Sequence, residues 1–133
     1  MNNLQNSAAL AGRILLAFMF VLSGFGKITG YEGTAGYMAS KGMPMIGVLL
    51  PLTILTELGG GLALIAGFKA RWVALLLAGF SIIAALIFHD FWAVADPMQH
   101  MNQQIHFLKN VSIAGGMLMV FAFGPGRYSL DKS

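Results

Sequence analysis

Glu57 stands out in this sequence because a charged residue is unusual at its position. It is a lone carboxylate between two apolar stretches, residues 43–56 and 58–68, which together are long enough to cross a bilayer. A charge at the centre of a membrane costs roughly 2.5–3.5 kcal/mol on insertion scales, so it is retained where it faces the interior of a helix bundle. Glu57 therefore either accepts a proton or hydrogen bond beside a redox headgroup, or forms a structural ion pair that fixes helix register.

Other polar side chains also lie inside or at the ends of apolar stretches. Lys109 and Asn110 can donate hydrogen bonds to a bound ligand, although Lys109 can also simply extend to the membrane interface. The candidate catalytic residues are Glu57, Lys109 and His106, and the candidate cofactor-binding residues are Asn110, His89, Lys27 and Arg13.

The histidines raise the question of haem or metal binding. His89 and His106 lie on adjacent span ends, and two imidazoles are the smallest set for axial haem ligation. Interfacial histidines that bond to Asp90 or water explain them more simply, so haem is not expected. A metal site that adds Asp90 and His100 is not expected either, because these spacings match no compact ligand pattern. Without cysteine, redox chemistry needs a bound cofactor or a redox protein partner.

The composition is that of an integral membrane protein. Of 133 residues, 57% are hydrophobic and 10% are charged, and the mean hydropathy is +0.75. Four apolar stretches reach the ~20 residues that a helix needs to cross the hydrocarbon core. We predict one domain, residues 1–133, that forms an all-α transmembrane bundle in the lipid bilayer, with spans near 8–28, 45–67, 72–92 and 105–124. No cleavage motif follows the first span, so we expect it to be retained.

The connections and charges predict the orientation. A short interfacial helix is expected at 34–40, and a loop at 91–104 is expected to cover the polar residues Lys27, His89, Asp90 and His106. The termini side would carry Arg13, Lys69, Arg71, Arg127 and Lys132, and the opposite side would carry Lys27, Lys41 and Lys109. Because cytoplasmic ends are enriched in Lys and Arg, both termini are expected in the cytoplasm. The cations form no basic patch, so no nucleic-acid partner is expected.

Depth in the membrane limits the counter-ion of Glu57. At 1.5 Å per residue, Glu57 lies roughly 18 Å from the outer end of the second span, and Lys109 lies about 7 Å below the start of the fourth. A lysine side chain covers the remaining gap, and Arg13 leaves a similar gap from the other side. The counter-ion is therefore expected to be Lys109 or Arg13, and the sequence alone does not choose between them.

Five short motifs follow in a recognisable order: Gly12-Arg13-Ile-Leu-Leu, Ser23-Gly-Phe-Gly-Lys27-Ile, Glu57-Leu-Gly-Gly-Gly, Ile87-Phe-His89-Asp-Phe-Trp92 and Phe107-Leu-Lys109-Asn110. Over residues 8–124 the sequence resembles the DoxX family of small four-span bacterial inner-membrane proteins. Asp90 stands where family members often have Asn, which argues against a ligand role there. The family has been linked to quinone and quinol oxidase complexes, quinone and catechol detoxification, and superoxide and thiol defence, without one common reaction.

The resemblance implies an inner-membrane component of a quinone-linked redox, oxidative-stress or detoxification system. The quinone would lie between spans two and four, near Glu57, His106, Lys109 and Asn110. Two other functions stay open: a non-catalytic scaffold that recruits a soluble oxidoreductase, and a small proton-coupled transporter, for which no inverted repeat is visible. Whether the chain is catalytic, and whether it forms a homo-oligomer, is left open by the sequence.

Overall fold

The computed structural model describes residues 1–131, so Lys132, which entered the orientation prediction, lies outside the described residues together with Ser133. Four long helical segments run through the structure, and the described residues contain no strand. They are α1 (Asn3–Thr29), the run of α3 (Ile46–Ile54), η1 (Leu55–Gly59) and α4 (Gly60–Ala66), then α5 (Ala70–Phe88) and α6 (Pro97–Phe123). The short helices α2 (Tyr31–Ser40) and η2 (Phe91–Ala93) connect the first pair of segments and the second pair. All four segments are long and apolar enough to cross a membrane, which confirms the predicted all-α fold.

The fourth segment begins earlier than expected. The Asp96 side chain accepts a hydrogen bond from the Gln99 backbone at 3.0 Å, and Pro97 occupies the first turn, which are both signals of a helix start. The expected loop at 91–104 is therefore wrong, because residues 97–104 form the first turns of α6. These turns consist mostly of polar residues, so a search for apolar stretches does not detect them.

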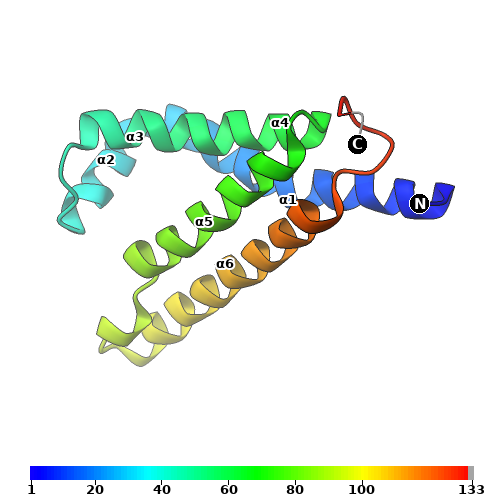
Figure 1. Ribbon diagram of the computed structural model, residues 1–133. Helices are drawn as coiled ribbons and strands as arrows, with labels where there is room; N and C mark the ends of the chain where they lie inside the picture. The colour runs from blue at the N-terminus through cyan, green and yellow to red at the C-terminus, as the bar shows by residue number, and fades with distance from the viewer. Residues whose placement is uncertain (132–133) are drawn as a thin grey trace.

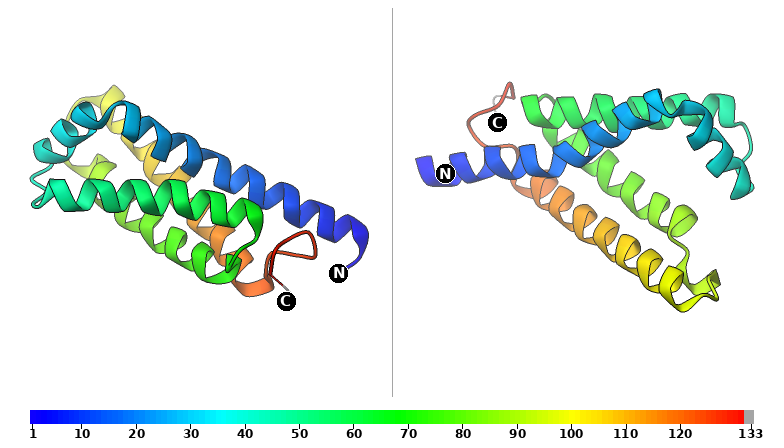
Figure 2. Two further views of the ribbon diagram at one scale, coloured as in Figure 1. Left: turned by 90° about the horizontal axis from the view of Figure 1, so that it is seen from above. Right: turned by 180° about the vertical axis from the view of Figure 1, so that it is seen from behind.

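The four segments form two pairs that diverge. α1 packs against η1 and α4, and α5 packs against α6. Figure 1 shows that the pairs meet at the end that carries both chain termini and separate toward the opposite end, and the view from behind in Figure 2 agrees. We call these the terminal end and the loop end. The loop end carries α2, the start of α3, η2 and the start of α6.

Glycines allow the first two spans to cross closely. A Cβ atom on Gly24 would lie 2.8 Å from the backbone nitrogen of Leu58, and one on Gly61 would lie 2.9 Å from Cγ2 of Val21. The backbones of α1 and the second span are therefore almost in contact, as in other membrane helix pairs with small residues at the interface. Where the pairs meet, the core is formed by Ala17, Phe20, Leu64, Ala70, Ala74, Leu77, Ala78, Ala114 and Met117.

Candidate functional site

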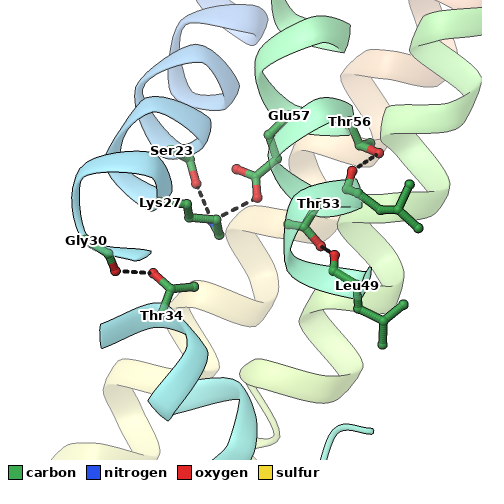
Figure 3. A network of polar contacts seen from close by, with 9 residues as sticks. Ser23, Lys27, Gly30, Thr34, Leu49, Thr53, Thr56 and Glu57 are labelled. Carbon is green, nitrogen blue, oxygen red and sulfur yellow. Dashed lines mark hydrogen bonds and ion pairs between the residues drawn. The ribbon is translucent and has the colours of Figure 1, made fainter. Parts of the chain in front are cut away.

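The counter-ion of Glu57 is Lys27. The Lys27 Nζ atom lies 2.8 Å from Glu57 Oε1 and donates a hydrogen bond to Ser23 Oγ at 2.7 Å (Figure 3). The expectation of Lys109 or Arg13 is therefore wrong. The depth argument considered distance from the membrane surface alone, whereas the close crossing at Gly24 brings α1 directly against η1. Ser23, four residues before Lys27, was missed as a partner, and this i, i+4 spacing was the available signal.

The Lys27–Glu57 ion pair lies on the side of α1 and η1 that faces α5. Phe20 lies seven residues before Lys27 on the same face of α1, and its ring contacts Phe80 of α5 with centroids 6.5 Å apart. A Cβ atom on Gly60, just past η1, would lie 3.1 Å from a methyl carbon of Leu77 on α5. The Lys27 side chain is 26% exposed, against 4% for Glu57. An ammonium carries three N–H groups, so Lys27 keeps one for a ligand beyond Ser23 and Glu57.

A π-helical turn, Leu55–Gly59, carries Glu57. Pro51 lies just before it and lacks a backbone donor, and the hydroxyls of Thr53 and Thr56 donate to the carbonyls of Leu49 and Leu52 at 2.9 and 2.8 Å. The wider turn sets the face on which Glu57 lies, and such turns are frequent at functional sites.

Arg13 binds the C-terminal tail and does not bind Glu57. Its side chain is buried, and its guanidinium donates to the carbonyls of Leu64 and Ile65, both at 2.8 Å, to that of Pro125 at 2.9 Å, and to that of Tyr128. These contacts occupy four of its five N–H groups. Arg13 precedes Lys27 by 14 residues, or roughly 21 Å along α1, so it lies toward the opposite end of the bundle. Its cofactor-binding role stays a prediction.

The second helix pair holds a histidine cluster at the loop end. The rings of His89 and His106 stack with centroids 5.1 Å apart, and His89 Nδ1 lies 2.8 Å from Gln103 Oε1. One turn further, Asn110 donates to the carbonyl of Ser81 at 3.2 Å. Among residues 1–131 no group of three or more His, Cys, Asp or Glu side chains is placed to hold a metal ion.

The expected cluster of Lys27, His89, Asp90 and His106 is divided in the structure. Lys27 binds Glu57, whereas Asp90 binds Lys41, with Lys41 Nζ 2.8 Å from Asp90 Oδ1. The rings of His89 and His106 stay stacked on each other. Lys41 was missed as a partner because it follows α2, far from Asp90 in the sequence.

Lys109 is exposed and does not contact Glu57. It lies seven residues before Gly116 on the same face of α6, and a Cβ atom on Gly116 would lie 3.0 Å from a methyl carbon of Leu16 on α1. Lys109 therefore projects from α6 on the side of α1, where the pairs have begun to separate. Glu57 and Lys27 lie on one pair, and His89, His106, Lys109 and Asn110 lie on the other.

Two surface hollows lie away from this polar group. One, of about 410 Å³, lies on the outer side of η1 and is lined by residues including Tyr31, Leu55, Leu58 and Gly59. The other, of about 270 Å³, lies between α1 and α6 near the terminal end and borders Arg13. Both are lined mainly by apolar side chains, as lipid-facing hollows are expected to be.

Comparison with known proteins gives consistent matches. The DoxX family matches residues 8–90. The inner membrane protein YqjF of Escherichia coli (strain K12) is 44% identical over 132 residues, which cover 99% of this chain and 95% of that protein. The inner membrane protein YphA of the same organism is 36% identical over 123 residues, which cover 92% of this chain and 87% of that protein.

A more distant relative is longer. A Surfeit locus protein 4 homolog of Schizosaccharomyces pombe is 29% identical over 132 residues, which cover 98% of this chain but 39% of that protein. No solved structure matches the chain. The family match over more than half of the sequence, together with two bacterial relatives aligned over nearly their full length, shows that this four-span membrane protein belongs to the DoxX family.

Proposed function

We propose that this protein is a multi-pass inner-membrane component of a quinone-linked redox or detoxification system. The observation that carries the proposal is the Lys27–Glu57 ion pair, which is held on a π-helical turn within a membrane span and faces the space between the two helix pairs. Ionisable residues within membrane spans usually serve ligand binding or proton transfer. The two Escherichia coli relatives named as inner membrane proteins support the location.

The chemistry of these residues supports a quinone headgroup as the ligand. Lys27 has an N–H group left to donate to a carbonyl oxygen, and Glu57 balances the lysine charge, which lowers the cost of keeping an ammonium inside the membrane. Lys109 lies on the same face of α6 as Gly116, the face that approaches α1, and we assign it the second donor. A quinone, when bound, accepts two electrons and two protons. In this proposal a separate redox protein delivers both electrons and both protons come from water at the loop end. Glu57, ionised while it pairs with Lys27, takes up and passes on these protons one at a time.

The test is quinone binding by the purified protein. We expect lipid extracts of the protein to contain quinone by mass spectrometry, and added quinone to bind saturably. Because Lys27→Met alone leaves Glu57 unpaired, the informative variant combines Lys27→Met with Glu57→Gln, which removes both charges. It should bind quinone roughly 10- to 100-fold more weakly, the loss expected for a hydrogen bond from a charged group. Lys69→Met, at the terminal end, is the matched control and should bind normally.

The outcomes separate this proposal from a scaffold. Wild-type protein that neither retains nor binds quinone would contradict the proposal. A scaffold that recruits a soluble oxidoreductase predicts that changes at Lys27 and Glu57 leave partner co-purification intact, whereas changes in α2 or η2 abolish it.

A further inference from the structure

Helix α2 bridges the two helix pairs at the loop end. It follows α1 and turns from the line of α1 toward the end of α5 (Figure 1). The Tyr37 hydroxyl donates to the carbonyl of Phe88 at 3.2 Å, and the two rings stack with centroids 5.6 Å apart. Tyr37 thus fastens α2 to the last turn of α5.

A second contact lies just beyond α2. Lys41 pairs with Asp90 at 2.8 Å, and the Lys41 Nζ atom also lies 5.9 Å from the centre of the Tyr37 ring. The hydrogen bond to Asp90 raises the pKa of Lys41, so the lysine stays charged at neutral pH. About a quarter of each side chain is exposed, 25% for Lys41 and 27% for Asp90, so water competes for both partners.

The terminal end is closed much more firmly. The buried Arg13 donates to four carbonyls, and the Asp131 carboxylate accepts from the backbone nitrogens of Lys69 and Ala70, both at 2.8 Å. The Leu130 backbone nitrogen also donates to the carbonyl of Ala66 at 3.0 Å. The buried hydrogen bonds of Arg13 are stronger than an exposed ion pair, so the loop end is the end that opens more easily.

Both ends of α2 are suited to rotation. Gly30 separates α1 from α2 and has φ −110° and ψ 40°, outside the helical region. Gly42 follows the helix with φ +74°, a conformation that favours glycine. Movement about these two positions leaves α1 and α3 intact, although it breaks the hydrogen bond from the Thr34 backbone nitrogen to Gly30 and exposes the buried Met38.

We propose that α2 with Lys41, here called the strap, closes the loop end and controls the access of water to the Lys27–Glu57 pair. Figure 3 shows Thr34 of the strap beside Lys27, on the loop-end side of the ion pair. When the strap is fastened to Phe88 and Asp90, it separates the pair from the aqueous surface. When it opens, water reaches Glu57 and its carboxylate exchanges protons with that side of the membrane. This inference does not depend on the identity of the ligand.

Thiol labelling tests the strap directly, because the chain contains no cysteine. Thr53→Cys places one thiol four residues before Glu57 on its loop-end side, in a position that is partly exposed. In sealed vesicles, a water-soluble, membrane-impermeant thiol reagent added on the loop-end side should label it slowly. Adding Tyr37→Phe and Lys41→Met removes the strap hydrogen bond and ion pair and should raise the labelling rate roughly 5- to 30-fold. Tyr31→Phe with Lys69→Met is the matched control and should leave the rate unchanged.

Two further probes keep the test decisive. Ser23→Cys replaces Thr53→Cys if the latter does not fold, and it should show the same acceleration. Ala17→Cys, at a fully buried position where the pairs meet, should stay unlabelled in every background. An unchanged labelling rate at both Thr53→Cys and Ser23→Cys would overturn the strap proposal. Labelling at Ala17→Cys once the strap contacts are removed would also overturn it, because it means that the whole bundle has loosened. The labelling rate reports the access of water and not the binding of quinone, so a failure here leaves the proposed function untouched.

Discussion

Lys27 and Glu57 form an ion pair between α1 and the π-helical turn, with Nζ and Oε1 2.8 Å apart. The pair exists because the two helices cross at Gly24, where no side chain keeps the backbones apart. The helix crossing and the ion pair therefore depend on each other, so a substitution that disturbs one should also disturb the other.

The ion pair should appear in a double-mutant cycle. Lys27→Met and Glu57→Gln should each destabilise the protein, Lys27→Met by roughly 3–5 kcal/mol because it leaves a buried carboxylate unpaired, and the double variant should cost less than the sum. Thermal unfolding in detergent measures this. The cycle of Glu57→Gln with Lys109→Met should be additive, since Lys109 does not contact Glu57. Additive losses with Lys27 would contradict the pair.

The close crossing predicts that Gly24 does not tolerate a methyl group. In Gly24→Ala the new carbon would meet Leu58 backbone atoms at 2.8–3.1 Å, so the helices must move apart at a cost of about 1–3 kcal/mol. Gly26→Ala is the matched control, because nothing lies within 4 Å of its added carbon, and the higher helix propensity of Ala should make it neutral or stabilising. Equal thermal stability of the two variants would show that the crossing is looser than described.

Arg13 should be required for docking of the C-terminal tail. Arg13→Met leaves the carbonyls of Ile65, Pro125 and Tyr128 without their donor, so we expect a loss of at least about 3 kcal/mol and rapid hydrogen exchange at the Leu130 and Asp131 amides. Arg127→Met is the control, because the Arg127 contact uses its backbone nitrogen. Slow exchange at both amides in Arg13→Met would be incompatible with this role.

The loop-end residues of α6 should affect quinone binding more than folding. Lys109 and His106 are exposed, so Lys109→Met and His106→Phe should leave unfolding temperatures nearly unchanged while quinone binding weakens. The phenyl ring of His106→Phe can keep the stacking on His89. Ser112→Ala, also exposed on α6, is the control for binding. Normal quinone binding in both variants would remove α6 from the proposed site.

The distribution of Lys and Arg predicts the topology. Reporter fusions after residue 133 and within 68–72 should report the cytoplasm, and a fusion near Pro97 should report the periplasm. A cytoplasmic result at Pro97 would invert the orientation and place the strap on the cytoplasmic surface.

Several features could be predicted from the sequence alone. The four apolar stretches predict the helical spans to within a few residues, except at the starts of α1 and α6, and the sequence also marks Glu57 as a buried intramembrane charge. These features depend on local composition and on the cost of burying a charge in lipid, which act on each segment independently of its neighbours.

Only the tertiary structure decided which polar groups meet. Lys27 rather than Lys109 or Arg13 reaches Glu57, Arg13 binds the tail carbonyls, and Asp90 binds Lys41 instead of the histidines. Hydropathy and helical spacing place a residue by depth and face, but they do not determine which helices are neighbours. That choice depends on glycines that let α1 approach η1 to backbone contact and on the divergence of the two helix pairs, which arise only when all four spans pack together.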